Sequence, residues 1–146
     1  MKNIKFYMVL GSLIAVCTAF DSIASKDIDK NLLKDIRTSA NSFDKSISTR
    51  NFKAAKEELL ALYPLMKKEF KEAKKLIHSL EKDGNSSNAE KLRISLDRKL
   101  EIHDKLHGLA EASSASLRVQ ADDAQALVRE YLGLLEEKQQ LLSSLN

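Results

Sequence analysis

The sequence contains few of the residues on which several large protein classes depend. Its 146 residues include one cysteine, one proline, four glycines and no tryptophan. A single cysteine allows neither an internal disulfide framework nor a cysteine-based zinc site. Glycine and proline are too scarce for the many turns of an all-β or α/β chain. These absences indicate an all-α protein whose core is built mainly from leucine and alanine.

Sequence motifs for catalysis are also absent. The sequence has no glycine-rich phosphate loop and no Ser/His/Asp set in a recognisable nucleophile elbow. Its carboxylates are scattered over polar faces, where the solvated, ionised form is the ordinary state. The formal net charge of +3 falls to +2 without the first 24 residues, so charge does not point to nucleic acid. We therefore expect a protein that is not an enzyme, has no cofactor and does not bind nucleic acid.

The chain begins with a segment typical of a signal peptide. Lys2 and Lys5 provide positive charge around the start of an apolar stretch at residues 6–16. This stretch has about the length of a signal-peptide core, ~7–15 residues, and is shorter than the ~20 residues that span a bilayer. Ser22-Ile23-Ala24 is the favoured cleavage site. We expect residues 1–24 to be a signal peptide and the mature chain to be exported to the periplasm, the cell surface or the medium.

Cys17 gives the same segment a second interpretation. The motif "IAVC", which ends at Cys17, resembles the lipobox of bacterial lipoproteins, in which the cysteine carries a lipid and becomes the first mature residue. Val16 differs from that pattern, because a small residue normally precedes the cysteine. Cleavage at Cys17-Thr18-Ala19 and an uncleaved anchor also fit the segment. Any membrane contact is thus expected only through the leader or a lipid anchor.

The remaining residues, 25–146, have the apolar periodicity of a single helical domain. A first helix is predicted by apolar or small residues at every third or fourth position: Ile28, Leu32, Ile36, Ser39, Phe43 and Ile47. After the capping residues "STRN" at 48–51, a second apolar stripe runs from Phe52 to Leu80. Its phase continues through Pro64, which predicts a kink in the helix and not its end.

The second half of the chain has one clear boundary followed by a heptad repeat. Asp83-Gly84-Asn85 predicts a left-handed helix exit, and Ser87 to Glu90 matches a capping box that would start the next helix. One heptad position then holds Leu96, His103, Ala110, Leu117, Ala124, Tyr131 and Leu145, with Lys138 as its charged interruption. Two antiparallel architectures fit this pattern: a long coiled-coil hairpin, or a bundle of four helices with a further break at 111–116, "EASSAS". We favour the four-helix bundle.

Two histidines form the candidate metal site. His103 and His107 lie four residues apart, which places both imidazoles on one helix face. If the chain folds back at Gly84-Asn85, Tyr63 and Met66 lie on the facing turn. The expected ligands are therefore His103, His107 and Met66. No further histidine or carboxylate is fixed by spacing, so two histidines in a polar boundary layer are the alternative.

Residues 50–70, "RNFKAAKEELLALYPLMKKEF", resemble the second helix of c-prime-type four-helix cytochromes, which are also small exported bundles. The chain lacks the C-x-x-C-H haem attachment motif of that family and has no methionine in the first mature helix. The resemblance therefore does not imply haem.

The helical faces indicate a binding function. The lysines of 67–75 are interleaved with Glu69 and Glu72, as on an ordinary solvated helix face. We expect an exported non-enzymatic protein with a binding, scaffold or chaperone-like role, engaging a protein partner or a second copy through a helical face. The alternative is a bundle that holds a metal, haem or lipid between its helices.

Overall fold

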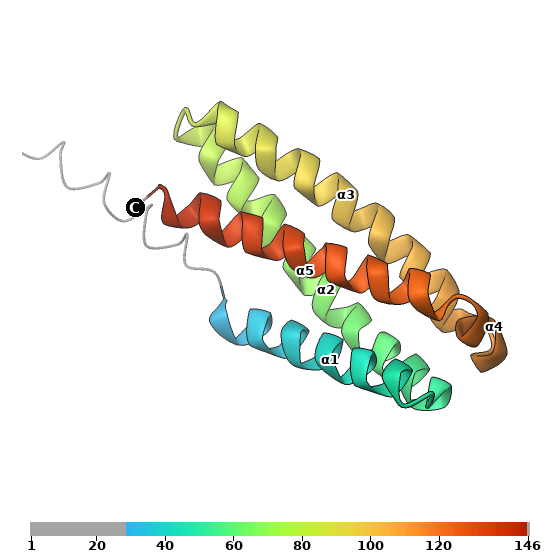
Figure 1. Cartoon of the computed structure of the whole chain (residues 1–146). Helices are drawn as coiled ribbons and strands as arrows, with labels where there is room; N and C mark the ends of the chain where they lie inside the picture. The colour runs from blue at the N-terminus through green and yellow to red at the C-terminus, as the bar shows by residue number, and fades with distance from the viewer. Residues whose placement is uncertain (1–28, 146) are drawn as a thin grey trace, which may run out of the picture.

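Five helices make up the part of the chain that the computed structural model describes, residues 29–145 (Figure 1). They are α1 (Lys30–Ser48), α2 (Phe52–Lys82), α3 (Ser86–Glu111), α4 (Ser114–Val119) and α5 (Ala121–Ser143). These residues contain no strand, so the all-α prediction is confirmed. The expected signal peptide, residues 1–24, and the candidate lipidation site Cys17 lie outside the described residues. Within 29–145, no helix combines the length and the apolar character that a membrane span needs.

The first two helices begin where capping side chains stand in the sequence. The Asp29 carboxylate accepts hydrogen bonds from the Asn31 and Leu32 amides, both at 3.1 Å, at the start of α1. The Asn51 side chain accepts one from the Ala54 amide at 3.2 Å, at the start of α2. These bonds satisfy amides that have no partner within the first helical turn. α2 continues through Pro64 to Lys82, as expected, while the kink stays a prediction.

Left-handed residues end the helices at both turns that flank α2. Arg50 has a φ of 57° between α1 and α2, and Gly84 has a φ of 74° between α2 and α3. Glycine adopts this conformation without the steric cost that a β-carbon adds, as predicted for Gly84. The capping box at Ser87 was wrong: α3 already begins at Ser86, because the Asn85 carbonyl accepts a hydrogen bond from the Ala89 amide at 3.1 Å.

The serine-rich segment at 111–116 breaks the second half of the chain, as the bundle prediction requires. α3 ends at Glu111, Ala112 is extended, and the Ser113 hydroxyl caps the short helix α4 by accepting from the Ser116 amide at 3.1 Å. The Lys56 ammonium of α2 donates to the Ala112 carbonyl at 2.7 Å and so fixes this corner. The long hairpin is therefore not formed, and α4 is a fifth helix that the periodicity did not separate.

The helices pack against each other, and successive long helices run in opposite directions (Figure 1). α2 packs between α1 and α3, and α5 returns along α3 and α1. α1 begins and α5 ends at the same end of the molecule, where the turn between α2 and α3 also lies (Figure 1). The core contains the predicted heptad members Leu96, His103, Ala110, Leu117, Ala124 and Tyr131, all of them buried. Lys138 occupies the next position of that heptad and is buried as well.

Candidate functional site

Three charged side chains meet in the core between α2, α3 and α5. Glu69 of α2 and Lys99 of α3 are each 1% exposed, and Lys138 of α5 is 5% exposed. Oε1 of Glu69 accepts hydrogen bonds from Nζ of Lys99 at 2.7 Å and from Nζ of Lys138 at 2.9 Å. Its Oε2 accepts a longer one, 3.4 Å, from the Tyr131 hydroxyl. We call these four residues the Glu69 cluster.

Helical spacing explains how charged residues came to lie in the core. Glu69 stands three residues after Met66 and four before Ala73, so it belongs to the buried stripe of α2. Its assignment to a solvated lysine-rich face was therefore wrong. Glu72 does fit that assignment, because its side chain is 44% exposed and pairs with Lys75 at 3.2 Å.

The two lysines occupy core positions in the same way. Lys99 stands three residues after Leu96 and four before His103, and Lys138 stands seven after Tyr131. The heptad repeat therefore marked Lys138 as its charged member, although it did not identify the partner on another helix. Lys99 and Glu69 could have been identified from the same sequence pattern, a charged residue in phase with an apolar stripe.

The Glu69 cluster contains an imbalance of charge. It holds two ammonium groups against one carboxylate, a formal charge of +1, when Glu69, Lys99 and Lys138 are all ionised. Tyr131 does not correct this, because burial and the neighbouring carboxylate raise the pKa of its hydroxyl far above the ordinary value. An uncompensated charge in a protein interior is costly. With all three groups ionised, the core carries one surplus positive charge, which an anion would stabilise.

Burial and ion pairing act in opposite directions within the cluster. Burial alone would raise the pKa of Glu69, but the two ammonium groups outweigh it and hold that pKa below its ordinary value. Because folding lowers this pKa, ionised Glu69 stabilises the folded state above its ordinary pKa, and that contribution is lost as the pH falls. For Lys99, burial lowers the pKa, the attraction of Glu69 opposes this, and the like charge of Lys138 adds to it.

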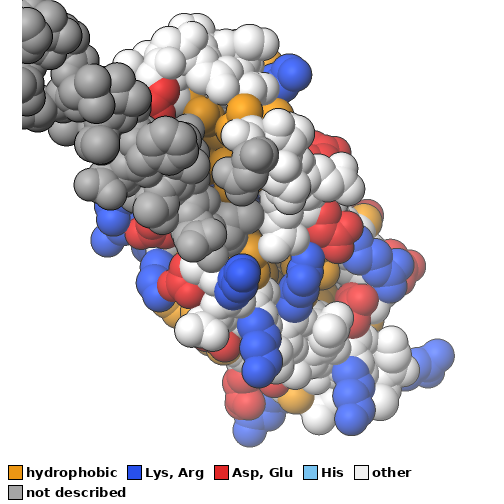
Figure 2. All heavy atoms as spheres, turned by 90° about the vertical axis from the view of Figure 1, so that its left-hand side faces the viewer, with side chains coloured by type: hydrophobic (Ala, Val, Ile, Leu, Met, Phe, Trp, Pro, Cys, Tyr) orange, Lys and Arg blue, Asp and Glu red, His pale blue; other side chains and the backbone are white. Residues whose placement is uncertain are grey.

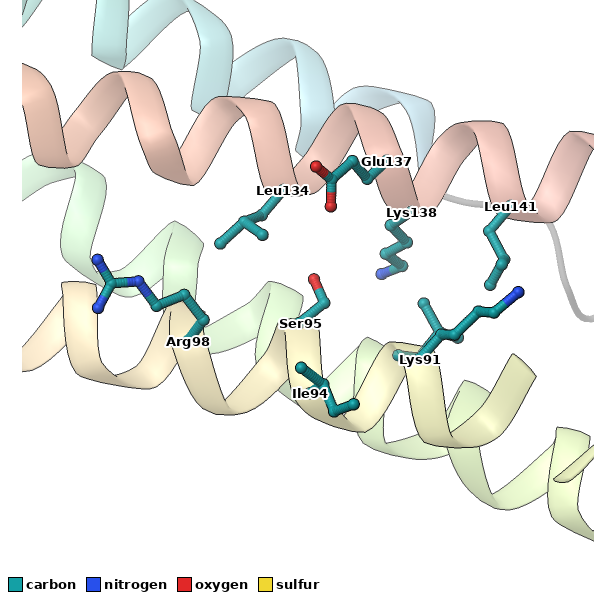
Figure 3. A pocket seen from close by; sticks show the side chains of 9 residues that line it. Lys91, Ile94, Ser95, Arg98, Leu134, Glu137, Lys138 and Leu141 are labelled. Atoms are coloured by element: carbon teal, nitrogen blue, oxygen red, sulfur yellow. The ribbon is translucent and has the colours of Figure 1, made fainter. Parts of the chain in front are cut away.

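A groove of about 450 Å³ lies beside the cluster, between α3 and α5 (Figure 3). Leu92 of α3 and Leu134 and Leu141 of α5 give it apolar walls, and Lys138 also lines it. Figure 3 shows Leu134, Lys138 and Leu141 extending from α5 toward α3, with the Ser95 hydroxyl pointing back from α3. The Ser95 hydroxyl oxygen is buried and has no hydrogen-bond partner among the described residues. The groove thus combines apolar walls with two polar groups that can donate hydrogen bonds.

Three further charged residues line the edge of the groove, and one of them, Arg98, is held by carboxylates outside it. Arg98 donates to both carboxylate oxygens of Glu130, at 2.5 and 2.9 Å, and to Glu101 at 2.7 Å. Lys91 of α3 and Glu137 of α5 also line the edge. In Figure 3 the Glu137 carboxylate lies alongside the α5 ribbon, whereas Lys138 extends into the space between α5 and α3. Lys138 therefore presents an ammonium group from α5 to a ligand between the helices.

The predicted histidine pair forms a separate aromatic cluster between α2 and α3. The Tyr63 ring lies against both imidazoles, with centroids 4.1 Å from His103 and 4.6 Å from His107. The facing turn of α2 was therefore predicted correctly for Tyr63. Nδ1 of His103 lies 3.0 Å from a carboxylate oxygen of Asp104, and Nε2 of His107 lies 3.2 Å from one of Glu111.

The metal-binding prediction has no further support from this arrangement. Among residues 29–145 there is no group of three or more His, Cys, Asp or Glu side chains that could hold a metal ion. Met66 is buried in α2, and it is the aromatic face of Tyr63 that stacks on the imidazoles. A site formed by His103, His107 and Met66 stays a prediction.

Comparison with known proteins supplies no family for this chain. No protein-family model matches it, and no curated protein and no solved structure matches it either. Its function must therefore be inferred from the chemistry of its own residues. On that basis the strongest feature is an apolar groove that ends on a buried, incompletely neutralised ammonium group.

Proposed function

We propose that the protein is an exported, non-enzymatic binding protein that takes an apolar ligand into the groove between α3 and α5. The observation that carries this proposal is the position of Lys138, which belongs both to the groove and to the buried cluster. The groove volume of about 450 Å³ falls within the ~300–1,000 Å³ typical of ligand sites. We infer that α1, α2, α3 and α5 form the antiparallel four-helix bundle that provides this site and that α4 is its connecting segment.

A role as a scaffold or chaperone that binds a protein partner is the second candidate. It is supported by Ile94 of α3, which is 63% exposed beside the groove. The other large exposed apolar side chains of the described residues, Leu60 and Val119, lie on α2 and α4. Single exposed apolar residues are common on protein surfaces. Figure 2 shows basic and acidic side chains interspersed over the face in view, so charge there does not favour a partner of one sign.

Filling the groove should weaken ligand binding by about tenfold or more without unfolding the protein. We expect the purified protein to bind a neutral naphthylamine dye, whose fluorescence rises in apolar surroundings, in equimolar amount. Ser95→Trp places an indole in the groove and loses no hydrogen bond, because the Ser95 hydroxyl has no partner among the described residues. The dye affinity should fall about tenfold or more, equivalent to ~1.4 kcal/mol. Fluorescence titration measures this change.

Asp97→Trp is the matched control for this experiment. Asp97 is exposed on the same helix and does not line the groove, so the substitution adds the same side chain elsewhere. It should leave the dye affinity within about twofold of the original. Equal losses in both variants, or dye binding that Ser95→Trp leaves intact, would show that the groove is not the binding site.

Export is tested separately through the N-terminus of the protein that accumulates in cells. The charged and apolar pattern of residues 1–24 supports cleavage after Ala24. Mass spectrometry of the exported protein should find a chain that begins at Ser25 and carries no lipid. A mature chain beginning at an acylated Cys17 would contradict the cleavage site, and a full-length chain in the cytoplasm would contradict export.

A further inference from the structure

The surplus charge of the Glu69 cluster is exposed to the groove at one point. Of its two ammonium groups, Lys138 lines the groove and Lys99 does not. Within the described residues, Nζ of Lys138 donates one hydrogen bond, to Oε1 of Glu69 at 2.9 Å. That carboxylate oxygen is already shared with Lys99 at 2.7 Å. An ammonium group has three N–H donors, so Lys138 can donate to an anion in the groove while it keeps its bond to Glu69.

A second donor lies across the groove from Lys138. The Ser95 hydroxyl projects from α3 toward the space that Lys138 enters from α5 (Figure 3). Its oxygen is buried and unpartnered among residues 29–145, and a buried polar group without a partner is costly. A carboxylate has two oxygens, which can accept from an ammonium group and a hydroxyl at the same time. The pair therefore fits a carboxylate better than a neutral polar group.

The apolar walls of the groove indicate that the carboxylate is attached to an apolar chain. Leu92, Leu134 and Leu141 line the groove, and a small inorganic anion would leave them in contact with water. A hydrocarbon chain would cover them. We infer that the ligand is a single-chain alkyl carboxylate, with its head group between Lys138 and Ser95 and its chain along the leucines. This inference rests on the proposed function of the groove and specifies the class of ligand.

Three probes of equal chain length test the inference on the purified protein. Dodecanoate, dodecanol and dodecyltrimethylammonium are each titrated below their aggregation concentrations, and binding is measured by calorimetry and by displacement of the naphthylamine dye. Dodecanoate should bind about tenfold or more tightly than dodecanol, because it adds a charge-assisted hydrogen bond. The cationic probe should bind more weakly than dodecanol, because it brings a like charge toward Lys138.

Two substitutions remove the surplus charge in different places. Lys138→Met and Lys99→Met each leave one ammonium group facing Glu69, so the cluster becomes neutral in both variants. Both should reduce the preference for dodecanoate over dodecanol to less than about threefold, while dodecanol still binds. If the Lys138 ammonium group acted alone, and the net charge of the cluster did not matter, Lys99→Met would keep the preference for dodecanoate. Lys74→Met, which removes an exposed lysine of α2 that does not line the groove, is the control and should retain the preference.

The outcomes separate the inference from the proposed function. Equal binding of dodecanoate and dodecanol by the unaltered protein would overturn the inference and leave the groove as a site for neutral apolar ligands. A preference that persists in either neutral-cluster variant would overturn it too. Failure of all three probes and of the dye to bind would overturn the proposed function itself. Circular dichroism of each variant establishes that the helices remain formed.

Discussion

Glu69→Leu should destabilise the protein by about 3–5 kcal/mol, because it leaves two buried ammonium groups without a carboxylate. That loss is a large part of the ~5–15 kcal/mol by which a domain of this kind is stable. Lys99 and Lys138 would then be like charges in the core with no carboxylate between them. Urea unfolding followed by circular dichroism measures the change. In the strongest case the variant is unfolded before urea is added.

Two further variants show whether unpaired charge causes the loss of stability expected for Glu69→Leu. Glu72→Leu makes the same substitution one position from the buried stripe, where the side chain is 44% exposed and pairs with the exposed Lys75, so stability should change by no more than about 0.5 kcal/mol. Combining Glu69→Leu with Lys99→Met and Lys138→Met removes all three charges and should restore stability to the original level or above. A triple variant as unstable as Glu69→Leu alone would show that lost packing and not unpaired charge caused the defect.

Leu59→Asp should unfold the protein, whereas Leu60→Asp should have little effect. The two leucines are neighbours on α2, but Leu59 is 3% exposed and Leu60 is 48% exposed. The first substitution buries a carboxylate without a partner, which costs several kcal/mol, and the second places it in water at a cost of about 0.5 kcal/mol or less. Thermal unfolding monitored by circular dichroism distinguishes the two. Similar melting temperatures for the two variants would contradict the packing of α2 described above.

Much of the fold could be predicted because helical periodicity and turn residues act locally. The capping residue Asn51, the left-handed Gly84 and the serine-rich break each depend on a few neighbouring positions. The start of α3 was misplaced because the sequence "SNAE" matches a capping box, although Asn85 is the N-cap and the helix begins at Ser86. α4 was missed because Ser116 and its neighbours form only a short helix between two longer ones.

The site could be predicted only in part because its interactions connect distant helices. Lys138 was visible as a charge in the heptad, but no local pattern says that its partner is Glu69, 69 residues earlier. Glu69 was misassigned because the lysines around it on α2 suggested an exposed face, and only its phase with Met66 reveals its burial. His103 and His107 were found because their spacing is local, and Tyr63 followed from the predicted turn at Gly84-Asn85, which brings α2 back along α3.

The Glu69 cluster also bears on the axial register of the helices. Leucine side chains on neighbouring helices can repack after a slide of one turn, about 5.4 Å, with another leucine taking the place of the first. Ammonium groups held 2.7 and 2.9 Å from one carboxylate oxygen have no equivalent position one turn away. The cluster draws on α2, α3 and α5, so a slide of any of these three helices would separate buried charges. The Glu69 cluster therefore favours one axial alignment of α2, α3 and α5, three of the four long helices.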